Sequence, residues 1–314
     1  MRAAQIKDYG HASDIEIVVV DKPTAGDDQV VVAVQAASIN PFDTIIREGY
    51  MKDNIPLNLP VTLGGDIAGV VESVGNSVSN VKVGDTIYGQ AHAVAGNSGA
   101  LAEFAATKSD QVAIAPKNIT PQEAASLPLV GVSAIQGLLE HLELSSGQKL
   151  FIHGAAGGIG SIAIQIAKHV GAYVAVTATG DGIDYVKSLG ADEVIDYKAT
   201  DFTESLSDFD AVFELAGGQD FDKSLAILKK GGKAVSMIAT ADQTKADELG
   251  VTAITQSTGV TTDRLNKLTT LVEDGVVKPQ IDKVFPLDQT KEAFEARESG
   301  TVRGKVVVAI AATD

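Results

Sequence analysis

The sequence predicts an α/β protein of two domains, one mostly β and one built on a doubly wound parallel sheet. Its length of 314 residues is about twice that of an average domain, which has roughly 150. Up to about residue 112 the apolar runs are short and β-branched, as at 15–20 and 30–34, with turn residues between them. From about 121 to 275, apolar strands alternate with helical periodicity, the pattern of βαβ units.

Six buried runs in the second region are the expected strands of the parallel sheet: 149–153, 173–177, 193–196, 211–215, 233–238 and 251–255. The tail of the chain predicts a short strand at 284–287, a helix ending near Arg297 and a strand at 305–310. We expect this tail to return to the first domain. The predicted division is therefore 1–122 with 280–314 for the first domain and 123–279 for the second.

Composition and charge exclude several classes of protein. Hydrophobic residues make up 45% and charged residues 21%, a balance that permits a packed core and argues against disorder. The net charge of −16 argues against nucleic acids and anionic membranes as partners. The absence of cysteine excludes disulfides, thiolate catalysis and zinc sites built on cysteine. Neither a signal peptide nor a membrane helix is predicted, so we expect a cytoplasmic protein.

The strongest local motif is a buried strand that runs into the glycine-rich turn GAAGGIG at 154–160. Apolar residues then recur at helical spacing, so the turn opens an amphipathic helix. Unpaired N–H groups at such a helix start bind a pyrophosphate where glycine permits close approach, here at Gly157 and Gly160. Ala155 stands at the first glycine of the G-x-G-x-x-G fingerprint of Rossmann domains. The alternative interpretation is a tight turn that binds nothing.

Several ordered motifs resemble the zinc-independent medium-chain dehydrogenase/reductases, especially quinone oxidoreductases similar to zeta-crystallin. They are INPFD at 39–43, GGDIAGVV at 64–71, VGD at 83–85, LPL at 127–129, the turn at 154–160, LGADEVIDY at 189–197 and RGK at 303–305. The resemblance covers essentially the whole chain. It implies a GroES-like, irregular β-barrel catalytic domain made from both chain ends, a Rossmann domain in the middle, and a homodimer formed through the edge strand at 251–255.

The expected absence of a metal follows from two positions. In zinc-dependent relatives a ligating histidine aligns with Gly65, and a ligating cysteine aligns with Asn40. The chain has five histidines, in no metal-like grouping, and we interpret each as a surface or packing residue: His11, His92, His141, His153 and His169. No zinc is therefore expected.

The activity implied by the resemblance is NADPH-dependent hydride transfer to quinones or α,β-unsaturated carbonyls, small electrophiles whose negative charge spreads onto an oxygen. The resemblance places Asn40 and Tyr50 near the nicotinamide and substrate, as donors to that oxygen. For Asn40 the alternative is a turn-stabilising residue, and for Tyr50 an aromatic residue at the rim. Asp66 is interpreted as a buried structural group, with a catalytic carboxylate as the alternative.

Further cofactor contacts are implied by the resemblance and by the glycine turn. They are Phe42, Ser133, Ala155, Gly157, Gly158, Ile159, Gly160, Thr177, Thr179, Tyr197, Ala216, Gly217, Ser236 and Ile238. Thr177 stands about where an NAD-selective domain carries an acid, and Tyr197 resembles a tyrosine of the 2′-phosphate pocket. These residues favour NADPH, with NADH as the alternative, because Asp181 would repel a phosphate and only Lys187 or Lys198 offers a compensating cation.

Two other functions stay open at this point. One is an enoyl-thioester reductase, which would need a longer apolar tunnel and a basic surface for its carrier. The other is a non-catalytic NADPH-binding protein, either structural or a redox sensor that binds RNA. The net charge argues against the basic carrier surface and against RNA.

Overall fold

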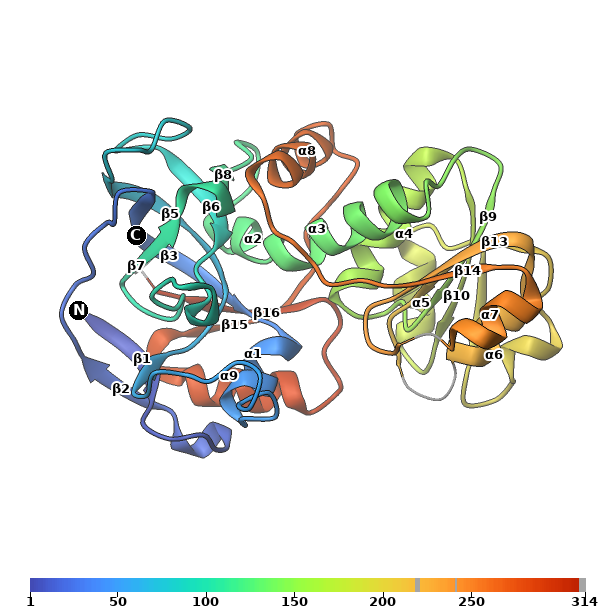
Figure 1. The fold of residues 1–314 in the computed structure, drawn as a ribbon, viewed down its shortest axis with the longest axis horizontal. Helices are drawn as coiled ribbons and strands as arrows, with labels where there is room; N and C mark the ends of the chain where they lie inside the picture. Colours follow the sequence, from blue (N-terminus) through green and yellow to red (C-terminus); the bar gives the residue numbers. More distant parts are fainter. Residues whose placement is uncertain (218–220, 241, 311–314) are drawn as a thin grey trace. The chain divides into compact units, whose positions relative to one another are not determined.

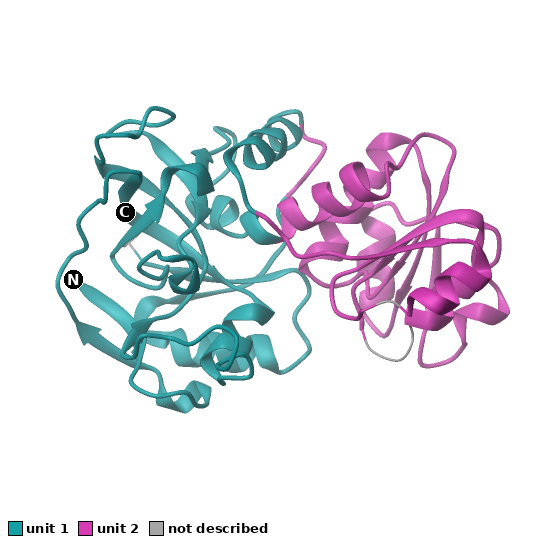
Figure 2. Ribbon diagram, viewed as in Figure 1, with its two compact units in different colours: residues 1–129, 260–274, 279–314 teal, residues 130–259, 275–278 magenta. Residues whose placement is uncertain are grey.

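The computed structural model describes residues 1–217, 221–240 and 242–310, and it divides into two compact units (Figure 1). Unit 1 comprises residues 1–129, 260–274 and 279–314, and unit 2 comprises residues 130–259 and 275–278 (Figure 2). Both ends of the chain thus contribute to unit 1. None of the described helices is long and apolar enough to cross a membrane.

Unit 1 is built on two sheets of mostly antiparallel strands. The smaller sheet has the order β2-β1-β4, and the larger has the order β15-β16-β3-β5-β6-β8, with β7 also pairing with β3. The strands are β1 (Arg2–Ile6), β2 (Glu16–Val19), β3 (Gln29–Ile39), β4 (Val61–Thr62), β5 (Asp66–Val74), β6 (Thr86–Gln90), β7 (Phe104–Lys108), β8 (Val112–Ile114), β15 (Ile281–Pro286) and β16 (Lys305–Ala309).

The core of unit 1 lies around the long strand β3, whose residues Val30, Val32 and Val34 are buried with Ile67 of β5 and Val306 of β16. The helices are α1 (Pro41–Arg47), α2 (Pro121–Ala125), α8 (Thr262–Glu273) and α9 (Thr290–Glu298). Short 3₁₀ helices connect them at η1 (Ala12–Asp14), η2 (Ala93–Ala95), η3 (Ser109–Gln111) and η7 (Leu287–Gln289). Helix α3 (Pro128–Ile135) contains the boundary between the units.

Unit 2 is a six-stranded, all-parallel sheet in the order β11-β10-β9-β12-β13-β14. This order reverses direction beside β9, so the sheet is doubly wound as the sequence predicts. The strands are β9 (Lys149–His153), β10 (Tyr173–Ala178), β11 (Glu193–Asp196), β12 (Phe209–Glu214), β13 (Leu228–Ser236) and β14 (Thr252–Thr255). Each overlaps its expected run.

Helices cover both faces of this sheet, with α4 and α5 on one side and α6 and α7 on the other (Figure 1). The helical segments of unit 2 are a π-helix η4 (Gln136–His141), α4 (Gly158–Val170), α5 (Gly182–Ser188), η5 (Phe202–Glu204), α6 (Phe221–Ala226) and α7 (Gln243–Leu249). Phe151 and Val212 of the sheet pack with Phe202, Phe221 and Leu225 on one face.

The division differs from the expected one at residues 123–129 and 279, which belong to unit 1, and in the placement of helix α8. The prediction assigns residues 260–274 to the second domain, whereas in the structure they pack within unit 1. Thr262 Oγ1 donates a hydrogen bond to the Val112 carbonyl at 2.8 Å, and the Tyr88 hydroxyl donates to the Leu265 carbonyl at 2.6 Å. Helix α8, whose Leu265 and Leu268 are fully buried, therefore packs against β6 and β8 within unit 1.

Candidate active site

The glycine turn of unit 2 joins β9 to α4, and each of its glycines meets a different steric demand. Gly154 has a φ of +83°, a left-handed conformation that favours glycine. A Cβ on Gly160 would lie 2.4 Å from the Ala155 carbonyl oxygen, so this glycine permits the helix to pack against the turn. A Cβ on Gly157 would find no atom nearer than 3.9 Å. Gly157 is exposed at the N-cap of α4 and thus leaves open space above the helix start.

Hydrogen bonds to Thr177 of β10 hold the glycine turn in place. Ala155 is fully buried and donates its N–H to the Thr177 carbonyl at 3.2 Å. The Thr177 hydroxyl is also buried, and it accepts the Gly154 N–H at 2.8 Å. Gly158 and Ile159 begin α4 and are half-buried. The structure therefore gives Thr177 a supporting role inside β10, whereas the half-buried Thr179 follows the strand end.

The ends of β12 and β13 meet at a buried carboxylate, Glu214, which sequence reasoning missed. Glu214 accepts hydrogen bonds from the N–H groups of Ala216 and Gly217 at 3.0 and 3.1 Å. It also contacts His153 Nδ1 and Ser224 Oγ, both at 2.9 Å. Burial raises the pKa of Glu214, but these donors outweigh burial and the net pKa is lowered. An ionised Glu214 therefore ties His153, the last residue of β9, to Ala216 and Gly217.

Ser236 and Ile238 lie beside this carboxylate, at the end of β13. The buried Ser236 hydroxyl accepts the N–H groups of Ile238 and Ala239 at 3.2 and 2.9 Å, which ends the strand. Ile238 is 59% exposed, and a Cβ on Gly217 would lie 2.7 Å from its Cγ2. The structure thus brings Gly217, Ser236 and Ile238 together at the carboxyl ends of two neighbouring strands, where doubly wound sheets bind ligands.

Two further predicted contacts of unit 2, Ser133 and Tyr197, lie away from these strand ends or have other partners. The Ser133 hydroxyl is fully buried and lies 2.7 Å from Thr258 Oγ1. Tyr197 is 52% exposed after β11, and Asp181 is exposed at the start of α5. Lys187 is exposed as well. The charged residues considered for the choice between NADPH and NADH, Asp181 and Lys187, therefore both lie on the surface of unit 2.

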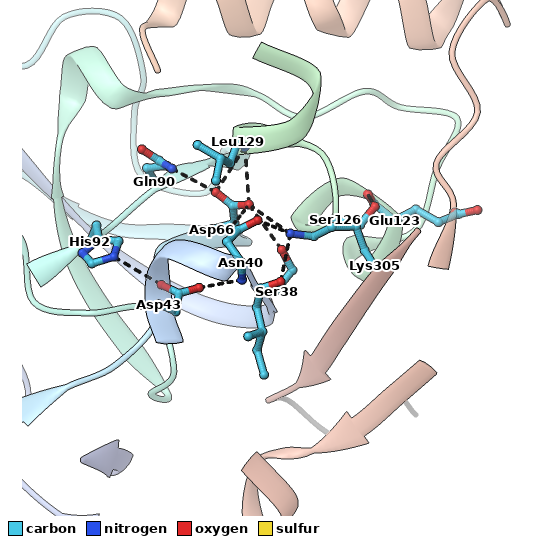
Figure 3. A network of polar contacts seen from close by, with 11 residues as sticks. Ser38, Asn40, Asp43, Asp66, Gln90, His92, Glu123, Ser126, Leu129 and Lys305 are labelled. Atoms are coloured by element: carbon cyan, nitrogen blue, oxygen red, sulfur yellow. Dashed lines mark hydrogen bonds and ion pairs between the residues drawn. The ribbon is translucent and has the colours of Figure 1, made fainter. Parts of the chain in front are cut away.

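Asn40 lies in a buried polar network of unit 1, at the end of β3 (Figure 3). Only 2% of the residue is exposed. Asn40 Nδ2 donates to Asp66 Oδ2 at 2.8 Å, and Lys305 Nζ donates to Asn40 Oδ1 and to the Ile39 carbonyl. The carboxamide is thus held between a cation and a carboxylate, and one of its two N–H bonds is used by Asp66. This arrangement leaves one N–H as the donor that Asn40 can offer.

Asp66 at the start of β5 is the acceptor at the centre of this network. It receives hydrogen bonds from Gln90 Nε2 and the Leu129 N–H, both at 3.2 Å, and from Ser38 Oγ at 3.3 Å. Its interpretation as a buried structural group agrees with this placement. Complete burial raises the pKa of Asp66 and lowers the pKa of Lys305, and their mutual attraction opposes both shifts.

The other two predicted residues of unit 1 differ in exposure. Phe42 is half-buried in α1, and its ring centroid lies 5.0 Å from that of His92. Tyr50 follows α1 and is 77% exposed, so within unit 1 it lies outside the buried network that holds Asn40. The structure thus brings Asn40 and Phe42 to one region of unit 1, whereas Tyr50, predicted near the substrate, lies on the surface of that unit.

The chain matches known proteins along its whole length. Residues 26–117 match the family described as alcohol dehydrogenase GroES-like domain, and residues 189–308 match that described as zinc-binding dehydrogenase. The 2-methylene-furan-3-one reductase of Solanum lycopersicum is 37% identical over 98% of this chain and 79% of its own length. The chain belongs to the quinone oxidoreductase group of the medium-chain dehydrogenase/reductases.

Two other members of this group support the assignment. The chloroplastic NADPH-dependent alkenal/one oxidoreductase of Arabidopsis thaliana is 36% identical over 98% of this chain and 79% of its own length. The solved structure of the quinone oxidoreductase from Coxiella burnetii covers 99% of this chain and 99% of its own, with a TM-score of 0.89 and 30% identity. The predicted GroES-like and Rossmann folds are thereby confirmed.

The two positions that align with zinc ligands of zinc-dependent relatives, Asn40 and Gly65, make other contacts in this chain. Asn40 is engaged by Lys305 and Asp66, and a Cβ on Gly65 would lie 2.9 Å from His92 Cδ2. Among the residues that the structure describes, no three His, Cys, Asp or Glu side chains group as metal ligands.

Sequence reasoning missed three buried ionisable groups: Lys305 and His92 in unit 1, and Glu214 in unit 2. Glu214 and Lys305 each adjoin apolar residues of the same strand, in VFEL at 212–215 and KVVV at 305–308. A charged residue inside such a run is a signal for a paired, buried group. His92 carries no comparable signal, because its neighbours on both sides are alanines that fit a surface turn equally well.

Proposed function

We propose that the protein is an NADPH-dependent oxidoreductase that transfers hydride to quinones or α,β-unsaturated carbonyl compounds. The observation that carries the proposal is the open turn at Gly157, above the amino terminus of the 13-residue helix α4. Free N–H groups and the helix dipole at such a position favour a pyrophosphate. The relatives described above carry names that specify NADPH, an alkenal or enone, and a quinone.

The residues of unit 2 fit a dinucleotide in this proposal. Gly157, Gly158, Ile159 and Gly160 would hold the pyrophosphate on the turn that Ala155 and Thr177 support. Ala216, Gly217, Ser236 and Ile238 would line the nicotinamide end, and Thr179 and Tyr197 the adenosine end. Phe42 and Ser133 stay proposed contacts as well. When bound, the reduced nicotinamide supplies the hydride, and the protein supplies orientation and charge stabilisation.

The polar network of unit 1 would stabilise the negative charge that forms on the substrate oxygen. Lys305 fixes Asn40 Oδ1, so the carboxamide cannot turn over without losing a charge-assisted hydrogen bond. The remaining N–H of Asn40 is therefore a preorganised donor of the kind that oxyanions require. Tyr50, exposed in unit 1, is proposed as a second contact to substrate.

Three finer statements belong to the same proposal. NADPH is preferred over NADH, because Thr177, and no acid, stands about where an NAD-selective domain carries Asp or Glu. The edge strand β14 pairs two copies into a homodimer, since the last strand of a sheet can accept a further strand. The cytoplasmic location stays a prediction from the sequence.

Turnover with defined acceptors tests the activity. A quinone, an alkenal and an enoyl thioester are each incubated with protein and either reduced cofactor, and loss of the cofactor's absorbance is followed. We expect oxidation of NADPH with the quinone or the alkenal. Oxidation with the enoyl thioester alone would instead establish a thioester reductase, and binding without oxidation by any acceptor would establish a non-catalytic protein.

A further inference from the structure

Glu214, the last residue of β12, divides its two carboxylate oxygens between different parts of unit 2. The side chain is fully buried. Oε1 accepts the N–H groups of Ala216 and Gly217 at 3.0 and 3.1 Å. Oε2 lies 2.9 Å from both Ser224 Oγ and His153 Nδ1. One oxygen thus anchors the carboxylate to α6 and β9, and the other holds the segment that follows β12.

The segment after β12 is also enclosed by its neighbours. A Cβ on Gly154 would lie 3.0 Å from the N and Cβ atoms of Ala216, so Ala216 packs closely on the start of the glycine turn. Gly217 has a φ of +91°, and a Cβ there would lie 2.7 Å from Ile238 Cγ2. Residues 216 and 217 therefore lie between the glycine turn and the residues that follow β13, and Glu214 fixes the direction of their N–H groups.

The direction of two carbonyl groups follows from these hydrogen bonds. The peptide bonds that join Leu215, Ala216 and Gly217 are trans, so each C=O points opposite to the N–H of the same peptide unit. Both N–H groups point to Oε1 of Glu214. The carbonyl groups of Leu215 and Ala216 therefore point away from the buried carboxylate.

This arrangement determines which ligand groups the segment can bind. Successive backbone N–H groups that converge on one point form a concavity that binds an anion, and here Glu214 itself is that anion. The segment therefore offers carbonyl acceptors at the carboxyl end of β12, where doubly wound sheets bind ligands. Acceptors of this kind suit an uncharged group that donates a hydrogen bond, such as a hydroxyl or an amide N–H, and they repel a phosphate.

We propose that Glu214 is a positioning residue for the nicotinamide nucleoside, because it turns the carbonyls of Leu215 and Ala216 outward as acceptors for that nucleoside's hydroxyl or amide donors. This inference rests on the proposed function, which assigns the pyrophosphate to the turn at Gly157. The glycine turn then supplies N–H donors to the charged part of the cofactor, and the segment after β12 supplies acceptors to an uncharged part. Glu214 itself contacts no ligand.

Two ligands and two substitutions test the inference. NADP⁺ contains the nicotinamide nucleoside, whereas adenosine 2′,5′-bisphosphate contains only the adenosine end. Glu214→Met keeps an unbranched side chain and removes both acceptors, so we expect the Kd of NADP⁺ to rise by about 10- to 30-fold, the effect of two neutral hydrogen bonds. Glu214→Gln keeps one oxygen for the two N–H groups, so its Kd should rise by less than about 3-fold. Neither variant should change the Kd of adenosine 2′,5′-bisphosphate.

The matched control is Asp210→Leu, at the other end of the same strand. Asp210 accepts the N–H of Lys149, the first residue of β9, at 2.8 Å and forms an ion pair with Lys229. It thus joins the amino ends of β9 and β12, as Glu214 joins their carboxyl ends. Asp210→Leu should lower the thermal stability and leave the Kd of both ligands unchanged.

A second measurement uses the unsubstituted protein alone. Its backbone carbonyl carbons are isotope-labelled, and the resonances of Leu215 and Ala216 are followed. We expect them to shift when NADP⁺ binds and to stay in place when adenosine 2′,5′-bisphosphate binds. Nicotinic acid adenine dinucleotide phosphate lacks the amide N–H and keeps the ribose hydroxyls. A shift with this analogue identifies a hydroxyl as the donor, and a shift with NADP⁺ alone identifies the amide.

The outcomes separate the inference from the proposed function. A folded Glu214→Met variant that binds both ligands as before, or loses affinity for both equally, overturns the positioning role and leaves the oxidoreductase activity standing. Carbonyl resonances that do not respond to NADP⁺ overturn it as well, whether or not the variant folds. If the unsubstituted protein bound neither NADP⁺ nor NADPH, the proposed function would fail and the inference with it.

Discussion

Replacement of Gly157 by valine separates cofactor binding from folding more cleanly than any other substitution in the turn. The backbone there has φ −82° and ψ 179°, extended values that valine adopts readily. The nearest atom to an added Cβ is the Gly154 carbonyl oxygen at 3.9 Å. Folding should therefore lose at most about 1 kcal/mol, the order of an N-cap substitution.

The expected loss in binding is much larger. The valine methyl groups would fill the space that a pyrophosphate needs, and charge-assisted hydrogen bonds to the turn are worth about 1.5–3 kcal/mol each. Loss of two such bonds amounts to roughly 3–6 kcal/mol, which corresponds to an increase in Kd of about 10²- to 10⁴-fold. Titration of NADPH by fluorescence gives the Kd, and thermal unfolding of the same samples gives the stability.

Gly160→Ala serves as the matched contrast. Its Cβ would lie 2.4 Å from the Ala155 carbonyl oxygen, so it should destabilise the fold by about 1–3 kcal/mol as other overpacked sites do. An unchanged Kd for NADPH in a folded Gly157→Val variant would refute the assignment of this turn to the pyrophosphate.

Four further predictions concern metal, assembly, cofactor and pH. Purified protein should contain no stoichiometric zinc, and its turnover should survive a strong chelator; one zinc per chain with chelator-sensitive turnover contradicts this. Sedimentation at micromolar concentration should give a dimer through β14, and a monomer speaks against that pairing. Steady-state kinetics should give a higher apparent affinity for NADPH than for NADH, and Asp181→Lys should widen the difference; a preference for NADH refutes the assignment. Stability should fall as acid protonates Glu214, because its pKa is lowered in the folded state; the loss begins near the unfolded pKa of about 4.3 and should be absent in Glu214→Gln.

The sequence predicts unit 2 well because its signals are local. Strand, glycine turn and helix follow one another within 149–170, and each is specified by neighbouring residues. The order of the six strands follows from the same repetition, since right-handed crossovers leave few alternatives. The sequence assigned helix α8 to the second domain. Its amphipathic pattern indicates that one face is buried but not which sheet buries it, and in the structure the helix packs against β8 of unit 1.

The candidate site is predicted less completely because its partners are distant in sequence. Asn40 was identified, but the residue that holds its carboxamide oxygen is Lys305, 265 positions away. His92 and Asp43 likewise belong to separate elements, and neither has a local pattern that pairs them. A motif identifies a residue type at a position, whereas a buried polar network depends on the register between strands that only the folded chain establishes.

The register of β16 against β3 explains why the site of unit 1 depends on both ends of the chain. Val306 pairs with Ile39 in antiparallel register, and this pairing places Lys305 beside Asn40. A shift of one residue would turn the lysine to the opposite face of the sheet, and Asp66 would then stay buried with no cation. The cost of leaving the Asp66 carboxylate buried and unpaired therefore favours the correct register. The residue that this register positions, Lys305, is also the one that orients Asn40, the proposed oxyanion donor. The same contact that stabilises the return of the carboxyl-terminal strand also preorganises the site for charge on the substrate oxygen.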